Sequence, residues 1–542
     1  MKILTADEMG AADRRSVDAG VPVVQLMEAA GAAVARFCLR RFAGDGLVVV
    51  LAGKGNNGGD GMVAARHLAE AGRRVRVALL GLAADVKGDA AAALKSAKKQ
   101  RGVEVVEVTD EGGLRAALEG AGLVVDAVVG TGFKPPLRGL AAAAQAFLET
   151  SAVAVVAVDL PSGRDADSVE EMAKGAFRAD AVVTFAAPKL AHVFGQLTAG
   201  KTFGPVVVAG IGTPEQVIES ATGLTWSGSS KATAEAPRAI NGNKGRLGHV
   251  LVVGGAFGKA GAPSMASLAA MRAGAGLVTA AVPREILAIV AAVAPELMLT
   301  PLAIEGSGGL SLDVLEEEAL ATLLKGISVV GIGPGLGQEG TTPEWVRTFV
   351  ERVTLPMVID ADALNALAGR TSVLRTAVET AKGKGRPRTI VLTPHPGEMA
   401  RLVEMTVREV EADRVGVARR FATEHGVTLV LKGWRTLVAH PDGRIAVNTS
   451  GNPSMAKGGS GDILTGIVAA MLAQYPADVA RAVEAAVFLH GLAGDFACLA
   501  QDEHTVLATD TVDHLWQAFC ARVVDADGLT WLSGTATNGT GR

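Results

Sequence analysis

The chain is most constrained by two long series in which short β-branched runs alternate with Ala-rich stretches of helical length. The first series extends over residues 47–211, and the second begins at residue 249 and closes with helices that reach about residue 523. Alternation of this kind predicts parallel strands with helices on both faces of each sheet. A Ser/Thr/Gly/Ala/Pro-rich stretch at 221–243 separates the two series and has no sustained period. We therefore expect two α/β domains joined within this stretch.

The apolar runs also predict where the strands lie. In the first series they are expected at 47–51, 74–80, 103–108, 123–129, 153–158, 181–185 and 206–209, and in the second at 249–253, 277–282, 328–332, 357–360, 389–392 and 428–432. Two further runs, 435–439 and 444–448, flank Asp442-Gly443 and predict a hairpin added to the second sheet. Residues 6–41 predict helix. The expected domains are 1–221 and 222–530, followed by a disordered tail at 531–542.

Composition excludes several broad classes. Hydrophobic residues make up 49% of the 542 positions, which is too many for a disordered chain. The formal charge is −4, whereas proteins that bind nucleic acids or membrane surfaces normally carry a basic excess. Cys38, Cys498 and Cys520 lack the spacing of metal ligands and indicate a reducing compartment. Neither a signal peptide nor a membrane-spanning run is evident, so we expect a cytoplasmic protein.

The first glycine-rich motif follows the strand expected at 47–51. Gly53–Gly58 matches G-x-G-x-x-G between a strand and a helix, which by itself predicts a dinucleotide-binding fold. That fold also needs an acidic residue about 20 positions later to hold the ribose. Here the next strand ends in Leu79-Leu80-Gly81, without a carboxylate, and Lys54 is not followed by Ser or Thr as in a phosphate loop. These departures disfavour a nicotinamide- or flavin-dependent oxidoreductase.

Oxygen-bearing side chains instead follow three strands of the first series. They are found in Asn56–Gly61, in Asp126 together with Gly130–Pro136, and in Asp159–Gly163. Open α/β sheets place their ligands at the carboxyl ends of strands, where carboxylates and carboxamides can bind a hard cation or ligand hydroxyls. Any one Asp could simply cap the next helix or turn. Three such ends on one sheet predict a binding site.

These residues and their order resemble the NAD(P)HX epimerase family over about residues 1–220, including the helical segment Leu26–Gly31. The resemblance implies a Rossmann-like three-layer fold and a potassium ion held by Asn57, Asp126 and Ser162. It also implies that the hydrated nicotinamide nucleotide contacts Asn56, Asn57, Gly58, Gly59, Asp60, Gly130, Thr131, Gly132, Phe133, Lys134, Pro135, Pro136 and Asp159. The implied reaction interconverts the R and S epimers at the hydroxylated ring carbon, with Asp159 handling a proton. Lys189 matches the family, but the Leu190-Ala191 that follows does not.

The second motif is Gly458-Gly459-Ser460-Gly461-Asp462, directly before the apolar helix expected from residue 463. Unpaired backbone N–H groups at a helix N-terminus form an anion site. An Asp beside them can take a proton from a substrate hydroxyl while a phosphoryl group arrives. A glycine-rich helix cap is the alternative without a catalytic role. The run is typical of ribokinase-like small-molecule kinases.

Within that superfamily, residues 240–520 resemble the ADP/ATP-dependent NAD(P)HX dehydratases. The matching segments, in the family's order, are Lys244–Gly248, Ala260–Ala262, Arg272–Leu277, Pro295–Met298, Gly333–Gly337, Asp360–Asn365, Thr393–Glu398 and Lys432–Thr436. The resemblance implies a hydrated-nucleotide site lined by Ala262, Gly335 or Gly337, His395 and the catalytic Asp462. It implies a site for ADP or ATP with Mg²⁺ at Lys432, Gly433, Trp434, Arg435, Thr436 and Gly461. Phosphorylating the ring hydroxyl would make it a leaving group, and elimination would restore the dihydronicotinamide.

The resemblances together predict a bifunctional enzyme that repairs NADHX and NADPHX. The motifs do not distinguish ADP from ATP, but the fusion and the Ala/Arg/Gly-rich composition resemble prokaryotic chains, and that resemblance implies ADP. A vitamin-precursor kinase of the hydroxyethylthiazole type, fused to a ligand-binding domain, is the alternative enzyme. A third hypothesis makes residues 1–220 a scaffolding module. Asp360 and Asp362 could hold magnesium or form an ordinary turn, and His490 is assigned to helix packing. We also expect a homo-oligomer.

Overall fold

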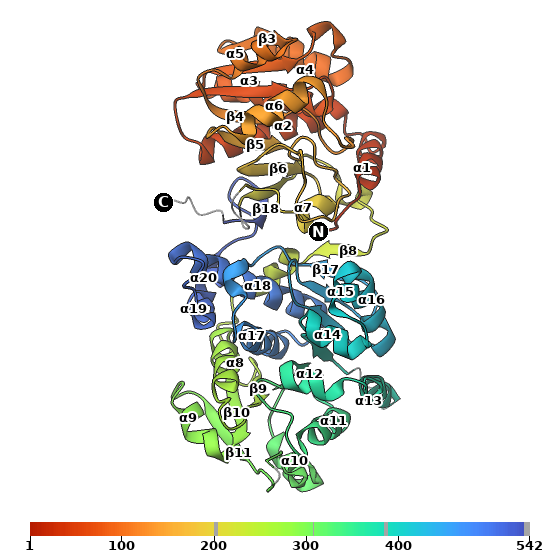
Figure 1. Ribbon diagram of the computed structural model, residues 1–542, viewed down its shortest axis with the longest axis vertical. Coiled ribbons are helices and arrows are strands. Elements are labelled where there is room, and N and C mark those ends of the chain that lie inside the picture. The colour runs from red at the N-terminus through yellow and green to blue at the C-terminus, as the bar shows by residue number, and fades with distance from the viewer. Residues whose placement is uncertain (200–203, 307, 384–387, 536–542) are drawn as a thin grey trace. The chain divides into compact units, whose positions relative to one another are not determined.

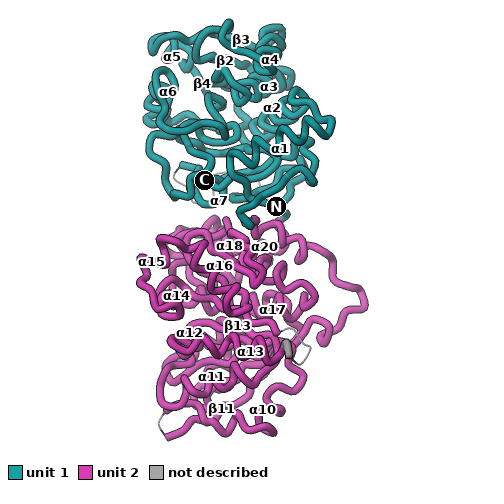
Figure 2. The backbone as a smooth tube through the Cα atoms, turned by 90° about the vertical axis from the view of Figure 1, so that its right-hand side faces the viewer, with its two compact units in different colours: residues 1–224, 522–542 teal, residues 225–521 magenta. Residues whose placement is uncertain are grey.

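The computed structural model describes residues 1–199, 204–306, 308–383 and 388–535. It forms two compact units, residues 1–224 with 522–542 and residues 225–521 (Figure 2). The chain passes from the first unit to the second between Leu224 and Thr225, inside the stretch expected to hold the junction. The two units are described separately below.

The first unit is built on an eight-stranded sheet with the order β18-β7-β6-β5-β4-β1-β2-β3. Its strands are β1 (Leu47–Ala52), β2 (Val75–Leu80), β3 (Val103–Val108), β4 (Ala121–Ala127), β5 (Ala154–Val158), β6 (Ala181–Phe185), β7 (Val206–Ala209) and β18 (Leu529–Ser533). Its helices are α1 (Ala6–Asp18), α2 (Val23–Arg41), α3 (Asn56–Glu70), α4 (Gly88–Lys99), α5 (Glu111–Leu118), α6 (Gly139–Glu149) and α7 (Leu190–Phe194) (Figure 1). Strands β1 to β7 are all parallel.

Alternate residues of β1 reach opposite faces of this sheet and produce its three layers. Val48 and Val50 pack in the cluster that contains α2, α3 and α4, whereas Val49 and Leu51 pack against α5 and α6. Strands that are buried on both faces consist largely of apolar residues, which explains why their predicted bounds lie close to the observed ones. The order β3-β2-β1-β4-β5-β6 reverses direction between β1 and β4, where an open α/β sheet binds its ligands.

The end of the chain departs from the sequence-based prediction. Residues 522–530 were assigned to the second domain and 531–542 to a disordered tail, but β18 pairs antiparallel with β7 in the first unit. The physical reason is local: Leu529 and Trp531 are buried in the core of the first unit, and Phe37 packs against the Trp531 ring. Only residues 536–542 of the expected tail lie outside the described residues.

The second unit has a ten-stranded sheet with the order β11-β10-β9-β12-β13-β14-β15-β16-β17-β8. Its strands are β8 (Leu224–Trp226), β9 (His249–Val253), β10 (Leu277–Pro283), β11 (Met298–Leu302), β12 (Val329–Ile332), β13 (Met357–Ile359), β14 (Ile390–Leu392), β15 (Thr428–Leu431), β16 (Leu437–Ala439) and β17 (Ile445–Val447). Its helices are α8 (Gly261–Arg272), α9 (Leu287–Ala291), α10 (Glu317–Leu323), α11 (Thr342–Arg352), α12 (Ala361–Leu367), α13 (Ser372–Gly383), α14 (Pro396–Val403), α15 (Val407–Ala412), α16 (Arg414–His425), α17 (Ser460–Gln474), α18 (Val479–Ala500), α19 (Ala508–Asp513) and α20 (Leu515–Cys520).

Strands β9 to β15 are parallel, and β15-β16-β17 form the antiparallel extension expected around Asp442-Gly443. The edge strands β8 and β11 were not predicted. β8 lies in the junction stretch, and β11 contains exposed or half-buried residues with Pro301 among them, so neither reads as a buried strand.

Helix α18 is the one helix in the described ranges that is long and apolar enough to cross a membrane. Its sequence carries few charges because 89% of its apolar window is buried inside the unit. It packs against α17 and α20, and residues such as Leu489 and Ala493 are fully or almost fully buried. The helix therefore belongs to the core of the second unit.

Candidate active sites

The first cavity has a volume of about 640 Å³ and opens where β1, β4 and β5 end. Its polar lining includes Asn56, Asn57 and Asp60 from α3, Gly130–Phe133 after β4, and Asp159 after β5. Met9 and Asp13 of α1 and Leu26 and Met27 of α2 close another side. The cavity therefore lies at the switch point of the first sheet.

Asp159 is the most constrained residue of this cavity. Its φ of +68° is unusual for a residue with a side chain and turns the carboxylate back across the end of the sheet. One carboxylate oxygen accepts hydrogen bonds from Lys189 Nζ and Thr184 Oγ1, both at 2.8 Å. The other accepts from the backbone N–H of Thr131 at 2.9 Å and from its hydroxyl. Burial favours the neutral acid, but Lys189 and these donors hold the pKa of Asp159 well below its ordinary value.

His192 fixes the backbone of Asp159 from the opposite side. Its Nδ1 accepts the Lys189 N–H at 3.0 Å, so Nε2 carries the proton and donates to the Asp159 carbonyl at 2.7 Å. Burial and the charge of Lys189 lower the pKa of His192 to about 4, so the ring is neutral at physiological pH. Lys189, directly before α7, and His192, within α7, thus hold the side chain and the main chain of the same Asp.

Two other carboxyl groups face the cavity without hydrogen-bond partners among the described residues, those of Asp13 and Asp60. Burial, then the negative charges of Asp159 and Asp13, raise the pKa of Asp60 well above its ordinary value. Burial raises the pKa of Asp13, with Asp159 adding to the effect and Lys189 opposing it. The cavity therefore contains one carboxyl group whose pKa is lowered, that of Asp159, and two whose pKa values are raised, those of Asp13 and Asp60.

Asp126 lies near the end of β4 and Ser162 follows β5, and neither residue lines the cavity itself. Ser162 donates to the Asp126 carboxylate through its N–H at 2.7 Å and its hydroxyl at 2.6 Å. Burial nevertheless raises the pKa of Asp126 to about 6, and no ion pair in the described part of the chain includes it. A buried carboxyl group that no cation neutralises fits a weakly hydrated monovalent cation with oxygen ligands. The Nδ2 atom of Asn57 is buried without a hydrogen-bond partner, but it is a donor, so only the carboxamide oxygen of Asn57 could serve as a ligand.

The remaining predicted residues of the first unit either allow the backbone to pack closely or lie outside the cavity. A Cβ on Gly58 would lie 2.0 Å from the Gly53 oxygen, and one on Gly59 would lie 2.7 Å from Met27 Cε, so both glycines permit close packing of α3. Lys134 points away to Asp165 and Asp167, at 2.8 and 3.0 Å. Two predicted residues, Pro135 and Pro136, are exposed and do not line the cavity.

The second cavity has a volume of about 660 Å³ and lies at the carboxyl ends of β13, β14 and β15. Of the predicted residues, His395, Lys432, Gly433, Trp434, Arg435, Thr436, Gly461 and Asp462 all line it. Asp360, the loop around Asn452 and the α18 residues Val487 and His490 complete the wall. Asp362 is not among the lining residues.

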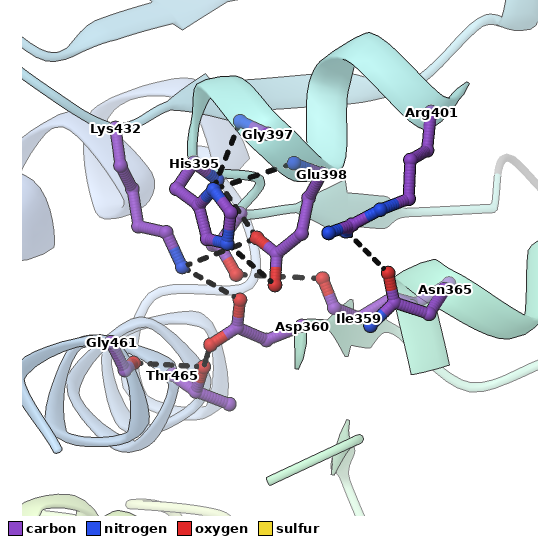
Figure 3. Close-up of polar contacts among 11 residues, drawn as sticks. Ile359, Asp360, Asn365, His395, Gly397, Glu398, Arg401, Lys432, Gly461 and Thr465 are labelled. Carbon is purple, nitrogen blue, oxygen red and sulfur yellow. Dashed lines mark hydrogen bonds and ion pairs between the residues drawn. The ribbon is translucent and has the colours of Figure 1, made fainter. Parts of the chain in front are cut away.

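Lys432 carries the central positive charge of this cavity (Figure 3). Its Nζ lies 2.9 Å from Asp360 Oδ1 and 3.9 Å from Glu398 Oε2, while Thr465 Oγ1 donates to Asp360 Oδ2 at 2.8 Å. Burial alone would lower the pKa of Lys432, but the two carboxylates raise it above its ordinary value. A Cβ on Gly461 would lie 3.1 Å from Lys432 Nζ, so glycine leaves room for this charge at the start of α17.

Asp462 lies in the first turn of α17, next to this ion pair. Burial, followed by repulsion from Asp360, raises its pKa to about 7, although Lys432 opposes the shift. The backbone N–H groups of Gly461 and Asp462 have no partners among the described residues, as expected at an anion-binding helix start. A carboxyl group that titrates near neutrality beside an anion site is suited to take a proton from an alcohol.

His395 combines a structural duty with a place on the cavity wall. Its Nδ1 accepts the N–H groups of Gly397 at 3.0 Å and Glu398 at 3.3 Å, which caps α14. Nε2 must then carry the proton and lies 3.5 Å from Glu398 Oε1. The exposed ring can therefore donate a hydrogen bond to a ligand while it caps the helix.

Ala262, Gly335 and Gly337 form a neighbouring group that does not line the second cavity. A Cβ on Gly335 would lie 3.0 Å from Ala262 Cβ, and the Gly337 N–H donates to Asp362 Oδ2 at 2.8 Å. The segment 360–362 connects this group to the cavity. In the described residues, no set of three or more His, Cys, Asp or Glu side chains could hold a metal. Magnesium commonly needs only one or two carboxylates because nucleotide phosphates supply other ligands.

Several supporting residues were not predicted from the sequence, including Asp13, Thr184, His192 and Thr465. Thr184, His192 and Thr465 lie at least 25 positions along the chain from the Asp that each contacts, and Asp13 reaches the first cavity from α1. Only His192 could have been found from the sequence, because it lies three residues after Lys189. The other residues could be assigned to the sites only once the fold was known.

Two largely parallel sheets each end in a charged cavity, of about 640 and 660 Å³, as expected for an enzyme with two separate active sites. Comparisons with known proteins extend this description. A family model described as NAD(P)H-hydrate dehydratase matches residues 250–515, and one described as YjeF-related protein N-terminus matches residues 23–191.

Curated relatives match the chain over nearly its whole length. The chain is 41% identical over 528 residues to the bifunctional NAD(P)H-hydrate repair enzyme of Moorella thermoacetica, covering 95% of this chain and 96% of the relative. It is 34% identical over 530 residues to the Escherichia coli enzyme of the same name, covering 96% and 94%. A crystal structure of Bacillus subtilis ADP/ATP-dependent NAD(P)H-hydrate dehydratase, co-crystallised with ATP/Mg²⁺, is 29% identical, with a TM-score of 0.44 over 54% of this chain and 96% of that one.

The chain belongs to the bifunctional NAD(P)H-hydrate repair enzyme family, with an N-terminal epimerase and a C-terminal ADP/ATP-dependent dehydratase. This confirms the function and the fold class expected from the sequence, a Rossmann-like domain followed by a ribokinase-like domain. The match includes both halves of the relatives, so neither a vitamin-precursor kinase nor a mere scaffold at the N-terminus is needed to explain the chain.

Proposed function

We propose that the first cavity carries out epimerisation and the second carries out dehydration, with the residues assigned below. The observation that carries this proposal is the protonation pattern of the two sites. In the first, Lys189 binds Asp159 and lowers its pKa, while burial and the charge of Asp159 raise the pKa of Asp60; in the second, Asp462, with its pKa raised to about 7, lies beside the Lys432–Asp360 pair. Each pattern suits the proton transfer that its reaction requires.

In the epimerase site, Asp60 donates its proton to the ring hydroxyl as the carbon–oxygen bond breaks. The electron pair of that bond leaves with the oxygen as water, and the ring nitrogen shares its lone pair with the cationic carbon. Asp159 stays ionised because Lys189 and Thr131 bind it, and its negative charge stabilises the ring cation. Water then adds to either ring face and returns a proton to Asp60, so both epimers form without net consumption of any reactant.

We propose Asn57, Asp126 and Ser162 as the potassium-binding residues of this unit. When bound, the cation would neutralise the buried carboxylate of Asp126 and would contact the carboxamide oxygen of Asn57. By doing so it would order the ends of β4 and β5 beneath the substrate. Asn56, Gly130–Phe133 and the N-terminal turn of α3 would then bind the nucleotide portion of the substrate.

In the dehydratase site, Asp462 takes the proton of the substrate hydroxyl while that oxygen attacks the terminal phosphorus of the nucleotide. The bond from phosphorus to the bridging oxygen breaks, and the shorter nucleotide leaves with the electron pair. Lys432 and the free N–H groups at the start of α17 stabilise the transferring phosphoryl group. Phosphate then leaves with the electron pair of its bond to the ring carbon, the adjacent ring carbon loses a proton to water, and the new double bond restores the dihydronicotinamide ring. His395, Ala262 and Gly335 or Gly337 would contact the hydrated substrate.

We propose ADP with Mg²⁺ as the phosphoryl donor, held by Lys432–Thr436 and Gly461. Arg435 lies 4.2 Å from the centre of the Trp434 ring, which supplies a flat, positively charged surface in the cavity. The choice of ADP over ATP rests on the resemblance of the fused, Ala/Arg/Gly-rich chain to prokaryotic chains. Turnover with each nucleotide at equal magnesium concentration tests it, because a chain that uses only ATP would contradict the proposal.

Substitution of the first site tests the epimerase assignment. In Asp159→Ala, conversion of R-NADHX to S-NADHX should fall to the spontaneous rate, whereas ADP-dependent dehydration of S-NADHX should be retained. Lys95→Met, an exposed position on α4, is the control. Unchanged epimerisation in Asp159→Ala would show that the site is wrongly assigned.

We further propose a homo-oligomer in the cytoplasm. Cys38, Cys498 and Cys520 are all free, which suits a reducing compartment. Leu499, Leu507 and Trp516 are exposed on or beside the terminal helices of the second unit and offer apolar surface for self-association. Light scattering of the purified chain tests the oligomer, and a monomeric mass at micromolar concentration would contradict it.

A further inference from the structure

The glycine-rich loop between β1 and α3 carries one charged side chain, that of Lys54, which lines the first cavity and takes no part in the proposed epimerisation. This side chain is 46% exposed, and its Nζ atom donates to Asp85 Oδ2 at 2.6 Å. Asp85 lies in the turn after β2 and is also half exposed. Because an exposed ion pair contributes little to stability, the pair with Asp85 does not by itself account for a cation at the cavity.

The ammonium group of Lys54 lies at the carboxyl end of β2. A Cβ on Gly81, the residue after that strand, would lie 2.4 Å from Lys54 Cε and 3.0 Å from Lys54 Nζ. Lys54 therefore places its charge where a side chain of residue 81 would project. The last residues of the strand and the residue that follows, Leu79-Leu80-Gly81, carry no carboxylate.

The end of the second strand has a defined role in sheets whose first strand is joined to its helix by a glycine-rich loop. Dinucleotide-binding folds place an acidic residue there, which binds the 2′-hydroxyl of the adenosine ribose. A carboxylate at this point repels a 2′-phosphate, whereas a basic residue accommodates it. In this chain the acidic residue is missing from the end of β2, and the ammonium group of Lys54 takes its place.

The first cavity also provides for the rest of a dinucleotide. Asp159, after β5, and Gly130, after β4, line the part in which the proposed epimerisation takes place. The N-terminus of α3 follows β1, has no side-chain cap and lines the same cavity, so it can bind phosphate. Strands β5, β4, β1 and β2 are consecutive in the sheet. The nicotinamide ring, the diphosphate and the adenosine ribose can therefore lie over successive strands, with the ribose next to Lys54.

We propose that Lys54 binds the 2′-phosphate on the adenosine ribose of NADPHX and makes the epimerase site select NADPHX over NADHX. The proposal rests on the assignment of the first cavity as the epimerase site, and it adds a residue that distinguishes the two substrates. A phosphate beside the ammonium group competes with the carboxylate of Asp85 for the same charge. Removal of that carboxylate should therefore strengthen the preference for NADPHX.

The test compares epimerisation of R-NADPHX and R-NADHX by the full chain, followed by chromatography without ADP or ATP so that no dehydration occurs. Wild type should show a kcat/KM about tenfold higher for R-NADPHX, the factor expected for one hydrogen bond between charged groups. Lys54→Met should lose this factor through a higher KM for R-NADPHX and should leave R-NADHX within about twofold. Lys54→Arg should keep the preference, and Asp85→Asn should increase it. High salt should weaken the preference, because it screens half-exposed charges.

Lys87→Met is the matched control. Lys87 is an exposed lysine two residues after Asp85, but it does not line the cavity. The control therefore removes the same charge from the same region without removing the proposed contact. Because the side chains of both lysines are largely in solvent, both variants should unfold at the wild-type midpoint.

Equal values of kcat/KM for R-NADPHX and R-NADHX in wild type would overturn the proposal and leave the epimerase assignment intact. A preference that persists in Lys54→Met, or that falls as much in Lys87→Met, would also overturn it. A loss of equal size for both substrates in Lys54→Met would do the same, since it would place the lysine on a part that the two substrates share. If wild type accelerates epimerisation of neither substrate, the epimerase assignment itself is contradicted, and the proposal falls with it.

Discussion

At the residue scale, Asp462 is the group on which the dehydration chemistry depends. Burial and Asp360 raise its pKa to about 7, so the basic form of the free enzyme increases as pH rises through neutrality. We expect kcat/KM for ADP-dependent dehydration to rise with pH through this range and then level off. Asp462→Asn should lower it about 10²- to 10⁴-fold at every pH. Profiles of S-NADHX turnover measure both effects, and a flat profile in wild type would contradict the role of Asp462 as base.

Lys189 gives a second prediction at this scale, on stability. It is 2% exposed and its Nζ lies 2.8 Å from the buried carboxylate of Asp159. In Lys189→Met the carboxylate would be buried without a cation, which should cost about 3–5 kcal/mol of the unfolding free energy of the first unit. Thermal or denaturant unfolding measures the loss, with exposed Lys95→Met as the matched control. An unfolding midpoint equal to that of the control would show that the pair contributes little.

Site residues that belong to short motifs could be predicted from the sequence, whereas the residues that contact and position them could not. Asp159, Asp462 and Lys432 each directly follow a strand or begin a helix, so their place at a sheet end could be predicted from local pattern. Asp13, Thr184 and Thr465 come from separate elements and reach the same groups only through the fold. His490 was visible in the sequence, but its place in the wall of the second cavity depends on the fold.

At the element scale, the strand β18 shows how the end of the chain contributes to the first domain. Trp531 is 5% exposed, packs against Phe37 and has Arg41 5.5 Å from the centre of its ring. Trp531→Ala should therefore destabilise the first unit by about 3–5 kcal/mol. Trp516→Ala, at a position that is 65% exposed, is the control and should leave unfolding unchanged. Equal unfolding curves for the two variants would contradict the pairing of β18 with β7.

The strands in the interior of each sheet could be predicted from the sequence, whereas the edge strands β8, β11 and β18 could not. Strands β1 to β7 and the central strands of the second sheet are rich in apolar residues, and their predicted bounds agree closely with the structure. The edge strand β3 was also predicted, because valines recur along its sequence Val-Glu-Val-Val-Glu-Val. β8 has three residues, β11 contains Pro301, and β18 is separated from its neighbour β7 by more than 300 residues of chain. Short length, exposure and long sequence separation each remove the local sequence pattern that would predict a strand and its partner.

At the scale of the whole molecule, each unit builds its cavity from its own residues. We therefore expect the two activities to separate. An equimolar mixture of Asp159→Ala and Asp462→Asn chains should convert mixed R- and S-NADHX completely to NADH, because the S epimer can pass between molecules through solution. Recovery of only the S fraction by the mixture would show that the two sites must be on one chain. Asp159→Ala alone measures the spontaneous epimerisation to be subtracted.

The most direct measurement of the whole account follows the absorbance of reduced nicotinamide in purified full-length protein given mixed R- and S-NADHX, potassium, magnesium, and ADP or ATP in parallel. Recovery of NADH from both epimers, dependent on a nucleotide and faster than spontaneous epimerisation permits, is the predicted result. Substituting sodium for potassium should slow recovery from the R epimer while leaving recovery from the S epimer unchanged. No recovery with either nucleotide would contradict the central claim that this chain repairs hydrated nicotinamide nucleotides.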